Sequence, residues 1–189
     1  MLEVWIAVGA VLVIAIAIAV YAVATSRSLK RLSSRVDGAW GDIAAQLAAR
    51  EELLPQLEAR LRGFATHEDK VFAAFAEARQ ASSQAETPEE LSAAENRVQG
   101  ALRGLFAASE AYPQLQSSRE FLQLQSDLVD VENRIQASRR FYNGGVREYN
   151  TKVKVFPNNL VAGPLHYEQR AFFEVADRAA ISQPPRVQF

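Results

Sequence analysis

The N-terminal part of the chain is dominated by an uninterrupted apolar run. Residues 4–24 read VWIAVGAVLVIAIAIAVYAVA and contain no charged side chain. As an α-helix this run is about 31 Å long, which matches the hydrocarbon core of a bilayer. Trp5 and Tyr21 lie near its two ends, where aromatic side chains favour the headgroup region. The pattern therefore predicts a transmembrane helix.

A cleaved signal peptide is the alternative to a retained anchor. Ala22 and Ala24 form an A-x-A-like cleavage site just before Thr25. However, the residues before the apolar run include Glu3 and no Lys or Arg, whereas secretory signals carry positive charge there. A retained anchor is therefore the favoured interpretation.

Charged residues flank the apolar run unequally. Only Glu3 precedes it, whereas Arg27, Lys30 and Arg31 follow it closely. Positively charged flanks tend to remain on the cytoplasmic side of a membrane. The charge bias therefore predicts a single-pass protein with a short outside N-terminus and the rest of the chain in the cytoplasm.

Beyond the apolar run, buried-type positions recur at alternating steps of four and three residues. One such seam follows residues 36–75, and a second follows residues 121–156 and ends at Phe156. This heptad spacing is typical of helices that pack at a shallow angle. We therefore expect one long helix over residues 27–84 and another over residues 117–155.

A shorter helix is predicted between the two long ones. Thr87-Pro88-Glu89-Glu90 has the residues of a capping box, with Thr87 as the N-cap and Glu90 as its reciprocal partner. This helix should end near Tyr112-Pro113, because the residue before a proline avoids the α region. Within the first long helix, Pro55 should cause a kink or a local break, since it lacks a backbone N–H.

These patterns predict an all-α fold. An N-terminal transmembrane helix is followed by an elongated antiparallel bundle of three long helices, with short C-terminal helical segments. The predicted division is a transmembrane anchor (1–26), a cytoplasmic helical bundle (27–181) and a flexible tail (182–189).

Composition excludes several classes of function. The 189 residues include no cysteine and only two histidines, and the formal net charge is −1. A chain without cysteine has no disulfide scaffold, cysteine nucleophile or Cys-based zinc site. A nucleic-acid-binding protein usually shows a basic excess, which is missing here. No sequence motif of a known catalytic site is present, so we expect no enzyme, cofactor, metal site or small-molecule substrate.

Four charged residues occupy positions in the two seams, namely Arg50, Glu68, Glu132 and Arg139. Buried charges are costly unless they are paired. The four can form cross-helix ion pairs that fix the register, line a functional polar groove, or lie at partly exposed ends of the seams. The sequence leaves these alternatives open.

A repeated Tyr-Asn pair lies on the last long helix. Tyr142 and Tyr149 are seven residues apart and share a face, and Asn143 and Asn150 lie beside them. The repeat indicates a polar ladder or a recognition surface. The alternative is a pair of buried tyrosines whose hydroxyl groups are hydrogen-bonded.

Two segments resemble the LemA family of bacterial membrane proteins. One reads WGDIAAQLAAREELLPQLEARLRGFATHE, and the other contains the block RRFYN–VREYN–FPNNL. The resemblance extends from the anchor to about Glu174. The residues that carry it are Trp40, Arg50, Leu54, Pro55, Leu57, His67, Glu68, Leu124, Glu132, Asn133, Arg139, Tyr142, Asn143, Tyr149, Asn150, Phe156 and Pro157.

The resemblance implies a bacterial cell-membrane protein with one transmembrane helix, a long helical bundle and no established enzymatic activity. We expect a membrane-anchored interaction or scaffold protein that contacts the bilayer and associates with itself or with other membrane proteins. By family analogy, a membrane protease is one candidate partner. The alternative function is an oligomeric assembly that forms a pore or remodels the bilayer.

Overall fold

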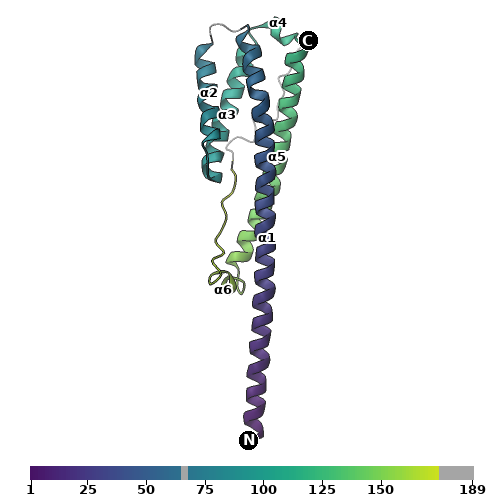
Figure 1. Ribbon diagram of the computed structural model, residues 1–189, viewed down its shortest axis with the longest axis vertical. Coiled ribbons are helices and arrows are strands. Elements are labelled where there is room, and N and C mark those ends of the chain that lie inside the picture. Colours follow the sequence, from purple (N-terminus) through teal and green to yellow (C-terminus); the bar gives the residue numbers. More distant parts are fainter. Residues whose placement is uncertain (65–67, 175–189) are drawn as a thin grey trace. The chain divides into compact units, whose positions relative to one another are not determined.

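The computed structural model describes residues 1–64 and 68–174, which form helices and connecting segments without a strand (Figure 1). The helices are α1 (Leu2–Arg62), α2 (Asp69–Ser83), α3 (Pro88–Ser109), α4 (Pro113–Gln116), α5 (Arg119–Lys154) and α6 (Asn159–Ala162). The chain divides into two units. Unit 1 comprises residues 1–41 and 141–170, and unit 2 comprises residues 42–140 and, among the described residues, 171–174. The all-α fold class is confirmed.

Unit 2 is packed around a hydrophobic core. The core residues come from α1, α2, α3, α4 and α5, and they are Leu54, Leu57, Leu61, Phe72, Phe75, Leu105, Leu115, Phe121, Leu124 and Leu128. Most of these were predicted by the heptad spacing, because positions three and four apart share one helix face. Pro55 lies on the exposed side of α1, and the helix continues through it, so no local break occurs there, and the kink stays a prediction.

The first long helix predicted over residues 27–84 is divided into two. Helix α1 ends at Arg62 and α2 begins at Asp69, and the seam does not continue across the gap. Phe64, which the heptad register placed in the seam, is 41% exposed. A glycine at position 63 favours a helix end, because it contributes little to helix stability. The heptad spacing in the sequence therefore continues past Arg62, although the helix itself ends there.

The start of α3 matches its sequence signature. The backbone N–H of Glu90 donates to Thr87 Oγ1, and the backbone N–H of Thr87 donates to the Glu90 carboxylate, at 3.2 Å each. Two N–H groups that the first turn of a helix would leave unpaired are thus satisfied. The predicted capping box is confirmed, and α3 ends at Ser109, close to the predicted stop.

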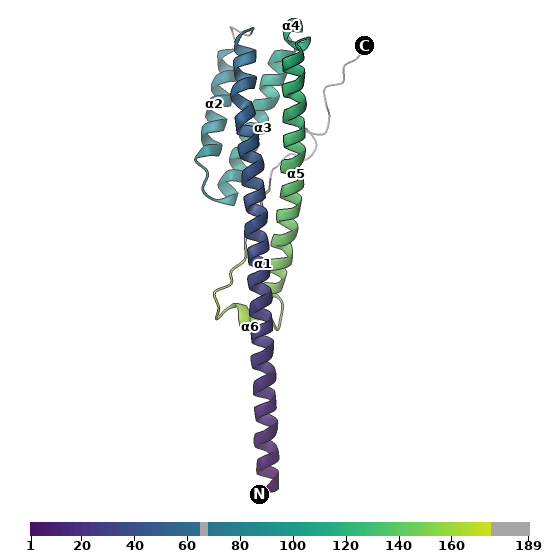
Figure 2. The same ribbon diagram turned by 45° about the vertical axis from the view of Figure 1, so that its right-hand side comes forward.

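Unit 1 contains an antiparallel pair of helix segments from α1 and α5, which lie side by side in both views (Figures 1 and 2). The rings of Trp40 and Tyr142 are 5.3 Å apart, and Lys152 donates a hydrogen bond to Ser28. Gly145 is buried against Val36, and an added Cβ would lie 3.4 Å from a methyl group of Val36, which is an ordinary van der Waals distance.

The seam predicted for α5 is buried along almost its whole length. Phe121, Ile135 and Val146 are each at most 2% exposed, as the spacing predicts. Phe156 is the exception, because α5 ends at Lys154 and Phe156 is 72% exposed. Its prediction as a seam residue is therefore wrong. The predicted tail (182–189) lies outside the described residues, and the boundary at residue 26 stays a prediction.

Candidate functional site

A buried ion pair lies inside unit 2. Arg50 of α1 and Glu95 of α3 form two parallel hydrogen bonds, Nη1 to Oε2 at 2.6 Å and Nη2 to Oε1 at 2.7 Å. Their side chains are only 3% and 1% exposed. A bidentate guanidinium–carboxylate pair has both charge and directional bonding, which makes it stronger than a single-contact pair. The pair therefore fixes the register of α1 against α3.

Three further polar side chains surround this pair. Glu132 Oε2 of α5 lies 3.6 Å from Arg50 Nη1, and Gln99 of α3 donates to Glu132 Oε1 at 3.0 Å. Ser82, near the end of α2, donates to Glu95 Oε1 at 2.9 Å. One cluster thus joins side chains from all four long helices of unit 2. We call these five residues, Arg50, Ser82, Glu95, Gln99 and Glu132, the polar cluster.

The charges in the polar cluster shift the pKa values of its members. Burial raises the pKa of Glu132, because it disfavours the ionised carboxylate; the nearby charge of Arg50 opposes this effect, and that of Glu95 adds to it. Glu132 Oε2 accepts no hydrogen bond, which also leaves the anion poorly stabilised. Burial works against the charged form of Arg50, but the hydrogen bonds and negative charges of Glu95 and Glu132 together outweigh burial and raise the pKa of Arg50.

The sequence-predicted seam charges have different outcomes. Arg50, Glu132 and Arg139 are all buried, at 2%, 9% and 8% exposure. Glu68 is half-buried and stands at the N-cap position of α2, where its side chain makes no capping bond. For Arg50 and Glu132, the structure therefore supports the ion-pair interpretation over an exposed seam end.

Sequence reasoning missed Glu95, which is the main partner of Arg50. The signal was present, because residues 91, 95, 98, 102 and 105 follow the same alternation of four and three as the two recognised seams. Glu95 is the one charged member of that series, whose other residues are Leu or Val. A charged residue in a heptad position is a candidate for burial in the same way as Arg50 is.

The Tyr-Asn repeat belongs to unit 1. Tyr142 and Tyr149 are 4% and 2% exposed, as expected for buried tyrosines of the seam. Asn150 does something different, because its side-chain amide donates to the backbone carbonyl of Arg170 and its carbonyl accepts from the Arg170 N–H, at 2.8 Å each. Asn150 thereby holds an extended backbone segment as a neighbouring strand would. Asn143 is half-buried.

The residues predicted to lie at the membrane interface belong to α1. Trp5 is 74% exposed, and Arg27, Lys30 and Arg31 are also exposed. Tyr21 donates a hydrogen bond to Asn158 Oδ1 at 2.6 Å, although the two residues are far apart in sequence. This bond ties the end of the apolar run to the turn between α5 and α6.

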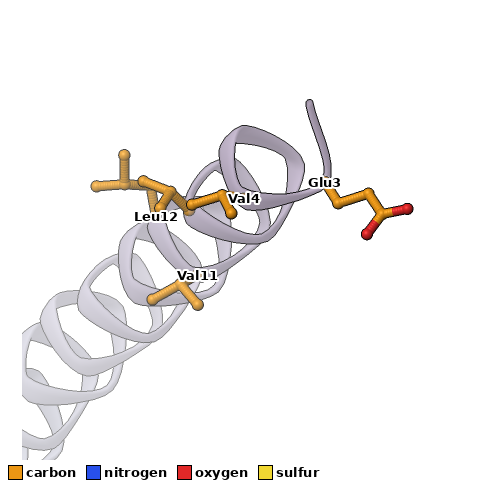
Figure 3. Close-up of a pocket in the computed structure, with 5 residues that line it drawn as sticks. Glu3, Val4, Val11 and Leu12 are labelled. Carbon is orange, nitrogen blue, oxygen red and sulfur yellow. The ribbon is translucent and has the colours of Figure 1, made fainter. Parts of the chain in front are cut away.

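The first residues of α1 form a shallow apolar hollow. Its side chains are those of Val4, Val8, Val11 and Leu12, with Glu3 directed away from them at the helix end (Figure 3). All of them come from one helix, so the hollow encloses no ligand-sized space. Across residues 1–64 and 68–174, no group of three or more His, Asp or Glu side chains could hold a metal ion. His67 lies outside the described residues.

A family model and one relative identify the family of this chain. The model of the LemA family matches residues 39–189. Protein LemA of Metamycoplasma hominis is 28% identical over 159 residues, which are 82% of this chain and 71% of that protein. Magnetosome proteins MamQ 1 and MamQ 2 of Paramagnetospirillum magneticum are 31% identical over 74 residues, which are 39% of this chain and 27% of each relative.

Proposed function

We propose, from the premise that the chain belongs to the LemA family, that it is a membrane-anchored helical bundle that acts as an interaction or scaffold module. The observation that carries this proposal is the exposure of apolar side chains on every side of α1 between residues 4 and 23. Val11, Leu12, Val13 and Ile14, which point about 100° apart in succession around the helix, are 67%, 58%, 67% and 59% exposed.

Water is a poor environment for such a helix. Burying a single Val, Leu or Ile side chain is worth about 1.5–3 kcal/mol, and more than ten large apolar side chains are exposed here. A helix that is apolar all round belongs in a protein core or in a bilayer. The most apolar window of α1 is not buried anywhere within the chain, which supports insertion of this segment into a membrane.

Retention of this segment is supported by contacts on both sides of Ala24. Tyr21, before the possible cleavage site, bonds to Asn158, and Leu29, after it, is fully buried in unit 1. Cleavage after Ala24 would remove the first contact. The intact mass of the mature protein tests this step, and a mass lacking the first 24 residues would contradict the anchor.

An interaction role is supported by the location of the charged side chains of unit 2. The polar cluster bonds internally, so the charged side chains available to partners lie on the outer faces of the helices. Chemical crosslinking and light scattering in mild detergent would test self-association. A strictly monomeric protein that captures nothing in a pull-down from membranes, membrane proteases included, would contradict the proposed role.

Topology is tested by one engineered thiol. Ser83 is exposed at the end of α2, and the chain has no native cysteine. We propose that the bundle is cytoplasmic, so a membrane-impermeant maleimide should label Ser83→Cys only after cell lysis. Labelling in intact cells would place the bundle outside.

Leakage from liposomes that contain the full-length chain would instead favour a pore or a bilayer-remodelling assembly.

A further inference from the structure

The segment of unit 1 that runs from the end of α5 through α6 to Leu165 exposes a group of large apolar side chains. Val155, Phe156, Leu160 and Leu165 are 50%, 72%, 64% and 49% exposed. We call these four residues the turn patch. They lie within eleven residues of one another and follow the C-terminus of α5 directly. A soluble surface seldom gathers so many exposed apolar side chains without a partner.

The position of the turn patch along α1 is fixed by contacts of known register. Trp40 contacts Tyr142, Ser28 bonds to Lys152, and Tyr21 bonds to Asn158. The residue numbers fall along one helix as they rise along the other, so residues 155–160 lie beside residues 20–25 of α1. The last residues of the apolar run therefore lie at the same height along α1 as the turn patch.

The position of Tyr21 indicates how deep the turn patch lies in a bilayer. It lies three residues, or about 4.5 Å along the helix, before the end of the apolar run at Ala24. Tyrosine favours the membrane–water interface, with its ring among the headgroups. Because Tyr21 is bonded to Asn158, a span that crosses the membrane must place the turn at the same interface.

The charges nearest to the turn patch are mainly basic. Residues 22–36 and 149–167 contain six basic side chains and no acidic one: Arg27, Lys30, Arg31 and Arg35 in the first range, and Lys152 and Lys154 in the second. Acidic groups of unit 1 border these ranges: Glu168 is exposed, Glu148 pairs with Arg35, and Asp37 pairs with Arg170. Basic side chains near a membrane surface attract anionic headgroups.

We propose that the turn patch is a second membrane contact, which inserts among the headgroups of the leaflet in which the α1 span ends. The inference rests on the proposed function, since it requires α1 to cross a bilayer. The bilayer is the occupant that the geometry favours, because its interface is already at the level of these side chains. A protein partner would have to reach the same level from outside the chain.

The test measures depth with nitroxide spin labels on single cysteines in the full-length chain. The labelled variants are Leu160→Cys in the turn patch, Val13→Cys in the middle of the span and Phe141→Cys as the matched control. Phe141 is also in unit 1 and 52% exposed, but it precedes the end of α5 at Lys154 by 13 residues, or about 20 Å. Each protein is reconstituted into vesicles of phosphatidylcholine with phosphatidylglycerol, and accessibility to oxygen and to a water-soluble nickel chelate is compared.

We expect the Leu160 label to favour oxygen, at about 5–10 Å below the phosphates, as an interfacial apolar surface does. The Val13 label should lie deeper, and the Phe141 label should remain in water. If the Leu160 label were as exposed to water as the Phe141 label while the Val13 label lay deep, the membrane contact of the turn patch would be wrong and the transmembrane anchor would stand. A water-exposed Val13 would overturn both. A Leu160 label shielded from both reagents would point to a protein contact and also overturn the proposal.

The charge contribution has its own readout. In vesicles of phosphatidylcholine alone, the Leu160 label should lie nearer to the water than with phosphatidylglycerol present. The substitution Lys154→Gln should reduce this dependence on lipid charge, since Lys154 is exposed next to the turn patch. A label depth that is independent of both lipid charge and Lys154 would overturn the electrostatic part of the inference.

Discussion

Units 1 and 2 hold helices together by different means. Unit 2 combines a core of leucine and phenylalanine side chains with a buried polar cluster that contains the Arg50–Glu95 pair. In unit 1, two helix segments are joined by buried apolar side chains such as Leu29, and their ion pairs, such as Arg35 with Glu148, lie at the surface. Only unit 1 contains the span. The comparison teaches that charge is placed inside unit 2 but mainly on the surface of unit 1.

This difference has an energetic meaning. A buried pair is costly to break, because the remaining charge has no water to solvate it, whereas an exposed pair is replaced by water at little cost. Unit 2 should therefore respond sharply to single changes in its polar cluster. Unit 1 should respond weakly to changes in its exposed ion pairs.

The largest effect is expected from Arg50→Met. This change leaves Glu95 and Glu132 buried without their cation, and such losses cost about 3–5 kcal/mol. Chemical denaturation in mild detergent, followed by circular dichroism, would measure the loss in the free energy of unfolding. A loss below about 1 kcal/mol, the level of an exposed pair, would remove the contrast between the two units.

A smaller, local effect is expected from Asn150→Ala in unit 1. The change removes two hydrogen bonds to the backbone of Arg170, and each such bond contributes about 0.5–1.5 kcal/mol net. Hydrogen exchange at the Arg170 amide should therefore become faster. Asn150→Asp keeps the acceptor for that amide and should retain part of its protection. Equal exchange in wild type and Asn150→Ala would show that the extended segment is held by other contacts.

Glu132→Gln should change how stability depends on pH. The raised pKa means that the folded chain binds a proton at Glu132 more tightly than the unfolded chain does. Glu132 therefore disfavours folding above its folded pKa, and this cost disappears as the pH falls toward its ordinary value of 4.5. The variant should be at least as stable as wild type at neutral pH, and the difference should narrow on acidification.

Glu90 provides a control whose effect on stability depends on pH in the opposite direction. Hydrogen bonds from the backbone of Glu86 and Thr87 lower the pKa of Glu90, so its contribution to stability is present above 4.5 and is lost as the pH falls through its folded pKa. Glu90→Gln should therefore reduce stability at neutral pH. Unfolding curves over a pH series would contradict the assignment of the two groups if both variants shifted in the same direction.

The smallest effect is expected from Arg79→Met. Arg79 pairs with Glu51 on the surface of unit 2, and the Glu51 side chain is 48% exposed. Exposed pairs contribute about 0.2–1 kcal/mol, so the loss should be several-fold smaller than for Arg50→Met. The same denaturation measurement makes this the matched arginine control. A loss as large as that of Arg50→Met would show that burial does not set the cost.

Much of the fold follows from periodicity. The seam positions of α1 and α5 were predictable because a heptad repeat places them on one face, whatever the partner is. The turn after Arg62 was not, because a hairpin of two helices can preserve the register of a single one. Phe156 was misassigned because the spacing continued two residues past the end of α5, where the pattern no longer reports on packing.

The polar cluster was only half predictable. The seam register identified Arg50 and Glu132 as candidates for burial, and it also contained Glu95, but pairing depends on which helices become neighbours. That choice rests on contacts between distant segments. Asn150 was singled out for its seven-residue repeat, whereas its partner is a backbone group of Arg170, and a backbone acceptor leaves no signal in the side-chain pattern.

The bond between Tyr21 and Asn158 distinguishes one side of the proposed transmembrane helix from the other. Because α1 is unbroken from the span through residue 41, its rotation about its own axis is set by the contacts that Leu29 and Val36 make on the inner side of unit 1. In the proposed transmembrane arrangement, the same flank of the span therefore always lies on the side of the turn between α5 and α6. Inserting one residue after Ala24 would turn that flank by about 100° and present a different one.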